Sequence, residues 1–255
     1  MIYALANQKG GVGKTTTAIN LAATLAQAGE RVLLVDVDPQ ANATTGLGVR
    51  PADGEPTMFE VFLGEVALAD IVQDTPVRNL TLAPSSRELA GLSVLLPGMG
   101  RREWRLKDSL RAMTSATGFG YSFVLIDCPP SLGLLTVNAL VAADEVIIPV
   151  QTEYFALEGL AQLLETIDAV RGGLNPALRV AGLVLTMADG RTKLAREVEA
   201  EVRAHFPDLT YRTVIPRNVR LAEAPSHGIP VSLLDPRCPG SDAYFDLAVE
   251  VVERA

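Results

Sequence analysis

The residues best suited to chemistry lie in a glycine-rich stretch near the start of the chain. Residues 7–17 read NQKGGVGKTTT, which nearly matches the phosphate-binding pattern of Gly, any four residues, Gly, Lys and then Ser or Thr. Glycines here let backbone N–H groups curl around phosphate oxygens without obstruction by side chains. The nucleotide-binding candidates in this loop are Lys9, Gly10, Gly11, Val12, Gly13, Lys14, Thr15 and Thr16. The pattern predicts a nucleotide site.

Two features of this stretch depart from the ordinary pattern. Gln8 stands where the first glycine of the pattern belongs, and a second lysine, Lys9, lies beside it. Lys14 can place a point charge on the β- and γ-phosphates of a nucleotide. Thr15 offers a hydroxyl to Mg²⁺, which prefers hard oxygen ligands. Because Lys14 already serves the phosphates, Lys9 needs a separate explanation.

Acidic residues end or follow two of the apolar runs that we expect to form strands. Asp36 and Asp38 lie in VDVDPQAN, and Asp127 ends FVLID. The carboxyl ends of parallel strands are where open α/β sheets bind ligands. A spacing of two residues points both side chains of Asp36 and Asp38 to one face, provided that the strand has not already ended. These carboxylates are therefore candidates to act near the phosphates.

Hydrophobic patterning predicts the elements that must position these residues. Helical patterns separate many short apolar runs, and several runs are apolar nearly throughout, as in strands covered on both faces. The predicted strands are IYALA, RVLLVD, LTLAP, FVLID, EVIIPV, RVAGLVLTM and RTVIP. We expect an α/β fold with a mostly parallel, twisted sheet of about seven or eight strands flanked by helices. No break in composition divides the chain, so we expect one domain spanning residues 1–255.

Composition narrows the class of protein further. The chain has 48% hydrophobic residues and a net charge of −8, which is typical of a globular protein with a substantial core. Its two cysteines, Cys128 and Cys238, fit neither a disulfide framework nor a CxxC metal pair, and they indicate free thiols in a reducing compartment. No apolar run reaches about 18 residues, so a membrane span is not indicated. We expect a cytoplasmic protein.

Taken together, these motifs resemble those of the ParA/MinD family of deviant Walker A ATPases, and within it the short chromosomal ParA proteins, often called Soj. KGGVGKTTTAINLA is similar to the family's phosphate loop. The resemblance continues in LLVDVDPQANATTGLG, VLIDCPPSLGLLTVNAL, TEYFALEGL and IPRNVRLAEAPSHGIPV, so it covers nearly the entire chain. It implies a P-loop NTPase fold and an ATPase that uses ATP and Mg²⁺.

The resemblance also implies roles for the loop and the acids. Lys9 would reach across a dimer to the phosphates bound by the other subunit, which makes ATP part of the subunit interface. Asp38 would orient the hydrolytic water. The catalytic candidates are thus Lys9, Lys14 and Asp38, and the candidate Mg²⁺ region consists of Thr15, Asp38 and Asp127.

A nucleotide base site follows from the resemblance alone. Pro216, Arg217 and Asn218 match the loop that packs on adenine in the family. Met187, at the end of LVLTM, is expected to form the opposite wall of that site.

A locally basic segment in an acidic chain favours DNA binding. Residues 186–220 contain seven Lys or Arg and five acids, a balance of +2, so the remainder of the chain carries −10. Binding to DNA phosphates without sequence preference requires such a local surface. By resemblance, and with Lys193 as an addition particular to this chain, the DNA-binding candidates are Arg191, Lys193, Arg217 and Arg220. A second basic cluster, RREWRLK at residues 101–107, could serve DNA, a regulatory partner or neither.

The resemblance therefore implies a DNA-partition ATPase. Such a protein dimerises on ATP, binds double-stranded DNA without sequence preference, and is released on hydrolysis stimulated by a ParB-type centromere-binding protein. It would act in chromosome or plasmid segregation in the cytoplasm, associated with the nucleoid. Because the chain begins almost at the phosphate loop, we expect no amino-terminal helix-turn-helix domain and hence no autorepression.

Two alternatives stay open at this point. A MinD-like, membrane-associated positioning ATPase shares the motifs but would end in a basic amphipathic helix. The tail here, DAYFDLAVEVVERA, is acidic, so we expect no stable membrane association. A metabolic P-loop enzyme, such as a biotin-pathway ligase or a cobyrinate amidase, would need a pocket for a small-molecule acceptor, and the sequence displays no such constellation.

Overall fold

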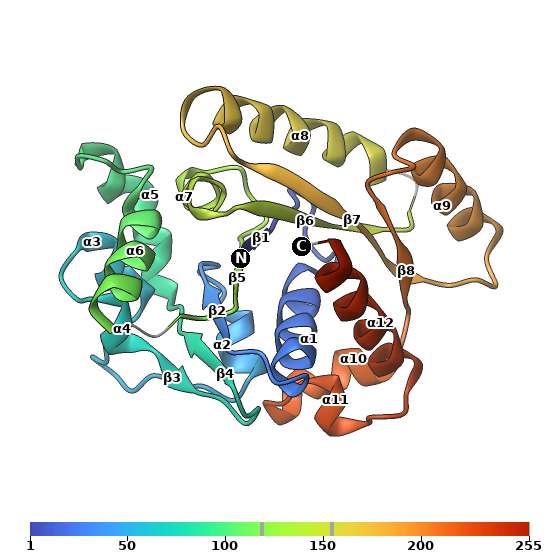
Figure 1. Ribbon diagram of the computed structural model, residues 1–255, viewed down its shortest axis with the longest axis horizontal. Coiled ribbons are helices and arrows are strands. Elements are labelled where there is room, and N and C mark those ends of the chain that lie inside the picture. Colours follow the sequence, from blue (N-terminus) through green and yellow to red (C-terminus); the bar gives the residue numbers. More distant parts are fainter. Residues whose placement is uncertain (118–119, 154–155, 255) are drawn as a thin grey trace.

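The phosphate loop follows the central strand of one large sheet. The computed structural model describes residues 1–117, 120–153 and 156–254, and its strands form an eight-stranded sheet in the order β3-β4-β2-β5-β1-β6-β7-β8 (Figure 1). The strands are β1 (Ile2–Leu5), β2 (Val32–Asp36), β3 (Gln73–Asp74), β4 (Leu80–Ala83), β5 (Phe123–Asp127), β6 (Glu145–Gln151), β7 (Arg179–Ala188) and β8 (Thr210–Pro216). Only the β3 and β4 pair is antiparallel within the described sheet. The predicted α/β fold with a mostly parallel sheet is confirmed.

The seven predicted runs all contain strands, and β3 is an eighth strand that the patterning did not predict. β3 has only two residues, which is too short for a period-two pattern to be recognised. β2 and β5 are buried at every position, as expected for central parallel strands covered on both faces.

Helices connect the strands and cover both faces of the sheet. They are α1 (Lys14–Gln27), α2 (Asn42–Gly46), α3 (Met58–Leu63), α4 (Leu68–Ile71), α5 (Leu92–Leu95), α6 (Arg105–Thr117), α7 (Leu134–Ala142), α8 (Ala156–Gly173), α9 (Lys193–His205), α10 (Val219–Glu223), α11 (Val231–Leu234) and α12 (Pro239–Arg254). One hydrophobic cluster packs α3 to α9 on one face, and a second packs α1, α2 and α10 to α12 on the other. In Figure 1, β6 and β7 run between α8 and the pair formed by α1 and α12.

The helix that follows the phosphate loop ends just before a glycine. α1 ends at Gln27, and Gly29 has a φ of +102°, a left-handed conformation that glycine adopts without a steric penalty. The N–H of Gly29 donates to the Ala26 carbonyl, and the N–H of Glu30 donates to the Leu25 carbonyl. These bonds satisfy carbonyls at the end of α1 and fix its length.

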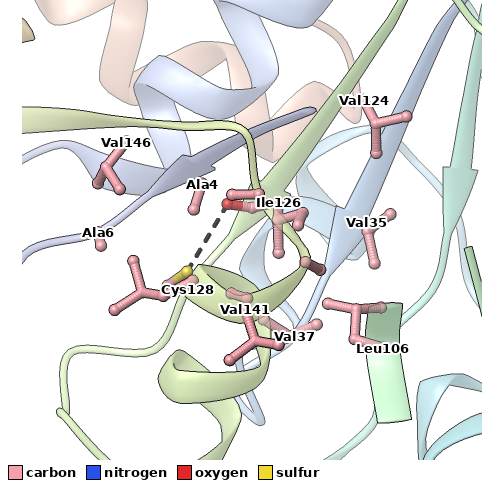
Figure 2. Close-up of a cluster of buried hydrophobic side chains, with 14 of the residues drawn as sticks. Ala4, Ala6, Val35, Val37, Leu106, Val124, Ile126, Cys128, Val141 and Val146 are labelled. Atoms are coloured by element: carbon pink, nitrogen blue, oxygen red, sulfur yellow. Dashed lines mark hydrogen bonds between the residues drawn. The ribbon is translucent and has the colours of Figure 1, made fainter. Parts of the chain in front are cut away.

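The two thiols lie inside the protein. Cys128 and Cys238 are free and buried. Figure 2 shows Cys128 among apolar side chains that include Ala4, Ala6 and Val146, with its Sγ 3.8 Å from the Ile126 carbonyl oxygen. Burial raises the pKa of the Cys128 thiol, with the carboxylate of Asp127 adding to the shift. A neutral thiol of this kind is a packing residue.

No helix in the described part of the chain is both long enough and apolar enough to cross a membrane.

Candidate active site

The ends of three central strands bring the predicted site residues together. In the sheet, Leu5 of β1 and Asp36 of β2 each pair with Asp127 of β5. The phosphate loop leaves β1 at this edge, where β1 has β5 on one side and β6 on the other. Connections leave the sheet in opposite directions at such a point, and the resulting crevice is the usual ligand site of a parallel α/β sheet.

The backbone of the phosphate loop has the conformation that its glycines predict. Gly11 and Gly13 have φ values of +74° and +83°, which a residue with a Cβ atom adopts only at a cost. The Gly13 carbonyl accepts a 2.8 Å hydrogen bond from the N–H of Thr17 and so begins α1. The Thr186 hydroxyl of β7 donates a 2.8 Å hydrogen bond to the Val12 carbonyl. The loop is therefore bonded to β7, which lies on the opposite side of β1 from β5.

Lys14 occupies the first position of α1, where exposed helix N–H groups favour an anion. Its side chain is buried, with Nζ 3.2 Å from the Lys9 carbonyl oxygen. Burial lowers the pKa of this ammonium, and the nearby Asp127 carboxylate opposes that shift. A buried cation at a helix N-terminus is well placed to bind phosphate, which is the role that the sequence predicts for Lys14.

Lys9 is engaged differently from Lys14. Its Nζ lies 3.0 Å from Oε2 of Glu153, and its side chain is 33% exposed. Its N–H donates to Oδ1 of Asn7. The predicted target of Lys9 is a phosphate in another subunit, so that role stays a prediction. Two residues of the TEYFALEGL motif, Tyr154 and Phe155, lie outside the described residues.

Asp127 is a buried carboxylate close to the charge of Lys14 but without a hydrogen-bond donor of good geometry. It is fully buried, and neither of its oxygens accepts a hydrogen bond within the described part of the chain. Burial raises its pKa well above the usual range, and the charge of Asp36 adds to this, whereas the neighbouring Thr15 hydroxyl acts in the opposite direction. A buried carboxylate without a partner is costly unless an ion or water supplies one.

These residues fit Mg²⁺ bound together with a nucleotide. Among the described residues, no three His, Cys, Asp or Glu side chains converge closely enough to hold a metal ion. Mg²⁺ normally keeps several waters and takes its other ligands from substrate phosphates and from one or two protein oxygens. The unpartnered Asp127 and the neighbouring Thr15 hydroxyl are sufficient for that arrangement.

The other two acids have different surroundings. Asp36 ends β2 and is fully buried, and burial raises its pKa to about 6 despite hydrogen bonds from Thr44 and Asp38. Both of its oxygens accept hydrogen bonds from the protein, so Asp36 is a structural residue of the turn. Asp38 lies beyond the strand end, is 5% exposed, and accepts the N–H of Gln40 at Oδ1.

The predicted base site is a hollow beside the phosphate loop. It has a volume of about 170 Å³ and is lined by residues that include Thr16, Thr186, Met187, Pro216, Arg217 and Asn218. Met187 has a φ of +53°, and such strain in a residue with a bulky side chain is concentrated at functional sites. The structure therefore places all four predicted base-contacting residues in one hollow next to Gly13.

Sequence reasoning missed five lining residues of this hollow, which are Thr186, Ile215, Leu221, Ala222 and, most distant in sequence from the phosphate loop, Tyr244 of α12. Tyr244 lines the hollow, and its hydroxyl lies 3.1 Å from the Thr17 hydroxyl of α1. The only signal for Tyr244 in the sequence is an aromatic residue in a helical pattern, which is the ordinary mark of a core residue.

Two larger hollows, of about 630 and 710 Å³, lie around Arg31 and Met1 at the opposite ends of the strands and contain none of the predicted site residues.

Three of the predicted DNA-binding cations are paired with carboxylates of their own chain. Arg191 makes bonds of 2.8 and 2.7 Å to Asp189, and these bonds lower the pKa of Asp189 to about 2. Lys193 lies 3.0 Å from Glu197. The other cation, Arg220, lies 2.8 Å from Glu223 and 3.4 Å from Asp235.

Arg217 differs from the other three cations, because its side chain forms no ion pair among the described residues. Its N–H donates to the Ala188 carbonyl, and it lines the base hollow. Arg191 and Lys193 have highly exposed side chains, at 89% and 85%. These pairs are therefore surface pairs, which water and salt screen strongly, and a phosphate could replace the carboxylates.

Comparison with known proteins identifies the family. A family model described as "AAA domain" matches residues 1–180. The chromosome partitioning protein ParA of Caulobacter vibrioides is 53% identical over 253 residues, which cover 99% of this chain and 94% of that protein. The sporulation initiation inhibitor protein Soj of Bacillus subtilis is 53% identical over 250 residues, which cover 98% and 97%. The chain belongs to the ParA/Soj family of chromosome-partitioning ATPases.

A solved structure agrees with the fold of this ParA/Soj family member. Cobyrinic acid a,c-diamide synthase from Mycobacterium smegmatis, with a bound ATP analog and magnesium, matches with a TM-score of 0.85 and 36% identity, over 99% of this chain and 94% of that one. The predicted P-loop ATPase fold and the family resemblance are thus confirmed. The roles of individual residues in the site stay predictions.

Proposed function

We propose that this ParA/Soj family member is a single-domain, Mg²⁺-dependent ATPase, residues 1–255, that dimerises on ATP and binds DNA without sequence preference. A ParB-type partner stimulates hydrolysis and so releases the protein from DNA during chromosome or plasmid segregation. The protein acts in the cytoplasm, associated with the nucleoid. The observation that carries this proposal is a phosphate loop with two lysines in different surroundings, Lys14 buried at the helix N-terminus and Lys9 partly exposed.

Phosphoryl transfer depends on positioning and charge stabilisation more than on covalent chemistry. Lys14 and the N–H groups of the loop bind the β- and γ-phosphates. Asp38 orients the attacking water. Asp127 and Thr15 hold Mg²⁺, which when bound neutralises charge that develops on the phosphate oxygens. This set of residues is sufficient for slow hydrolysis, and slow hydrolysis suits a timer.

The dimer depends on ATP because Lys9 contacts the partner's nucleotide. When the γ-phosphate is lost, the contact between Lys9 and the partner's nucleotide weakens at both sites of the dimer. The equilibrium then shifts toward monomers. A ligand can shift this equilibrium only by its differential affinity for the two states, and the γ-phosphate is the group that differs between ATP and ADP.

DNA binding uses a surface that only the dimer presents in full. Arg191, Lys193, Arg217 and Arg220 contact phosphates, and each subunit contributes one set. Doubling the number of phosphate contacts raises affinity steeply, because each contact releases condensed counterions. Dimerisation on ATP therefore controls DNA binding without any change in the DNA contacts themselves.

DNA binding measured with ATP, with ADP and without nucleotide tests the proposal. We expect binding to duplexes of unrelated sequence with ATP, and at least about tenfold weaker binding in the other two conditions, since halving the phosphate contacts removes much of the counterion term. Equal DNA affinity in all three conditions contradicts the nucleotide switch. A duplex preference for one sequence contradicts the phosphate-only surface.

The two alternative functions have direct tests. Sedimentation with anionic liposomes and ATP separates the partition function from a MinD-like membrane function, and we expect the protein to stay in the supernatant because α12 exposes acidic residues such as Asp242 and Asp246. The metabolic alternative is less favoured, because the identity to the cobyrinate enzyme is 36% against 53% to the partition proteins.

A further inference from the structure

Four residues behind the predicted catalytic loop form a closed ring of hydrogen bonds. The Asp38 N–H donates to Oδ1 of Asp36 at 3.1 Å, and the Thr44 hydroxyl donates to Oδ2 of Asp36 at 2.7 Å. The Ser85 N–H donates to the Thr44 hydroxyl oxygen at 2.9 Å. The Ser85 hydroxyl donates to the Asp38 carbonyl at 2.6 Å and closes the ring.

The ring joins three elements that are distant in sequence. Asp36 ends β2, Thr44 lies in α2, and Ser85 follows β4. All four side chains are buried, with exposed fractions of 0% for Asp36, 5% for Asp38, 1% for Thr44 and 2% for Ser85. Water cannot replace these bonds, so each one matters more than an equivalent bond at the surface.

The proton positions in the ring are fixed by the chemistry of the groups. Asp36 accepts a third bond, from the N–H of Thr44, so that its three described bonds all come from donors of the protein. The Thr44 hydroxyl has one proton, which it gives to Asp36, so it meets Ser85 as an acceptor. The Ser85 hydroxyl then has its own proton available for Asp38. Every donor in the ring has one defined acceptor.

This ring holds the backbone of Asp38 at both its N–H and its carbonyl group. The carboxylate of Asp38 extends directly from that backbone. Among the described contacts, it accepts one hydrogen bond, at Oδ1 from the N–H of Gln40. The position of the carboxylate is therefore set mainly by its peptide groups, which Asp36 and Ser85 hold together with the N–H of Ala41, a second donor to the Asp38 carbonyl at 2.9 Å. A displacement of about 1 Å in a reacting group can cost about 100-fold in rate.

We propose that Ser85 and Thr44 are positioning residues for the hydrolysis of ATP, acting through the backbone of Asp38. This inference rests on the proposed function, in which Asp38 orients the water. Neither residue touches the nucleotide in this account. A loss of either hydroxyl leaves the phosphate loop and the base hollow unchanged and lets the Asp38 carboxylate move.

The test compares Ser85→Ala and Thr44→Val with matched controls. Ser86→Ala removes a neighbouring hydroxyl that accepts a bond from Thr57, and Thr45→Val removes one that donates to Ala41. For Ser85→Ala and Thr44→Val we expect kcat to fall about tenfold or more, with the Kd for ATP within about twofold of wild type. The controls keep the wild-type kcat, and Thr44→Ser, which retains the hydroxyl, restores most of it.

A double variant separates positioning from a general loss of structure. If Ser85 acts through Asp38, adding Ser85→Ala to Asp38→Ala lowers kcat by less than about twofold further. The inference is overturned if the fall in kcat of the double variant equals the product of the two single falls. A wild-type kcat in Ser85→Ala also overturns it. So does a fall in kcat that is matched by equal losses in ATP affinity and melting temperature.

The same measurements distinguish failure of this inference from failure of the proposed function. If Asp38→Ala loses hydrolysis while Ser85→Ala and Thr44→Val do not, only the positioning role is wrong. If Asp38→Ala hydrolyses ATP at the wild-type rate, the assignment of Asp38 is wrong and the positioning role falls with it.

Discussion

The ammonium of Lys9 lies 3.0 Å from the carboxylate of Glu153 in the same chain. Gln151 holds the other oxygen of Glu153 with a 2.6 Å hydrogen bond from its amide. If Lys9 contacts a phosphate in the partner subunit, it must share or leave this carboxylate when the dimer forms. The pair is partly exposed, so the exchange costs little, and a phosphate can compete for the lysine.

Replacing each lysine separately tests their different roles. Lys9→Ala is expected to keep ATP affinity nearly unchanged and to abolish ATP-dependent dimerisation, because its target belongs to the partner. Lys14→Ala is expected to weaken ATP binding by about 10- to 100-fold, since it loses a charge-assisted bond. A labelled-ATP titration and sedimentation measure the two properties. Equal loss of nucleotide affinity in both variants would falsify the role of Lys9 across the dimer.

Glu153→Gln should make dimerisation easier. The amide still accepts a hydrogen bond from Lys9 but lacks the charge, so Lys9 is released to a phosphate at lower cost. A surface ion pair contributes about 0–1 kcal/mol, and a dimer contains two, so the dissociation constant of the ATP dimer is expected to fall by up to about 25-fold. Sedimentation at graded protein concentration measures it. A weaker dimer would mean that Glu153 positions Lys9 for the phosphate instead of competing with it.

Replacing Asp38 should trap the ATP state. Asp38→Ala is expected to bind ATP, dimerise and bind DNA, but to hydrolyse ATP about 10²- to 10⁴-fold more slowly, the range for loss of a group that handles the attacking water. Phosphate release with ParB and DNA present is the measurement. A wild-type rate under those conditions shows that another group orients the water.

Local patterns were enough to predict the phosphate loop and the acids beside it. The glycines at positions 11 and 13 indicate by residue type a loop that can wrap around phosphate, and an aspartate that ends an apolar run, such as Asp127, indicates a strand end at the ligand edge. These features depend on residues close together in sequence. The parallel order of the strands then follows from the helices between them.

Contacts between distant segments could not be predicted in the same way. Thr186 and Val12 are 174 positions apart, and Tyr244 and Thr17 are 227 apart. A lone Thr or Tyr in an apolar pattern is compatible with many partners, and only the packing of β7 and α12 selects one. The same holds for Ser85, whose neighbours in sequence give no indication that its hydroxyl reaches Asp38.

Asp127→Asn should separate the metal requirement from nucleotide binding. The amide keeps the shape of the carboxylate but lacks its charge, so the Mg²⁺ concentration for half-maximal hydrolysis is expected to rise about tenfold or more, as for other groups that orient metal-bound water. Hydrolysis measured across a Mg²⁺ titration tests this. ATP affinity measured in chelator serves as the control, and we expect it to be unchanged. An unaltered Mg²⁺ dependence would exclude Asp127 from the metal region.

Because Arg191 pairs with Asp189, one substitution can lower the affinity for DNA and another can raise it. Arg191→Glu is expected to abolish DNA binding with ATP hydrolysis unchanged in the absence of DNA, because Arg191 lies outside the phosphate loop. Asp189→Asn is expected to raise DNA affinity by a few-fold, because it frees Arg191 from a surface ion pair. Filter binding on two unrelated duplexes measures both, and both sequences should respond alike, since phosphate contacts carry no base information.

The salt dependence of binding gives the sharper measurement for these arginines. Each phosphate contact contributes about 0.9 to the slope of log affinity against log salt on duplex DNA, so Arg191→Ala or Arg220→Ala should each lower the slope of the dimer by about 1.8. The milder alanine variants keep enough affinity for the slope to be read. Arg87→Ala, at an exposed position outside the predicted surface, is the control.

If the double variant of Arg191 and Arg220 keeps the wild-type affinity and slope, the DNA surface lies elsewhere, and residues 101–107 become the next set to replace. There Arg101 is bound to Asp108 in the same bidentate way, so Asp108→Asn would then raise DNA affinity where Asp189→Asn does not.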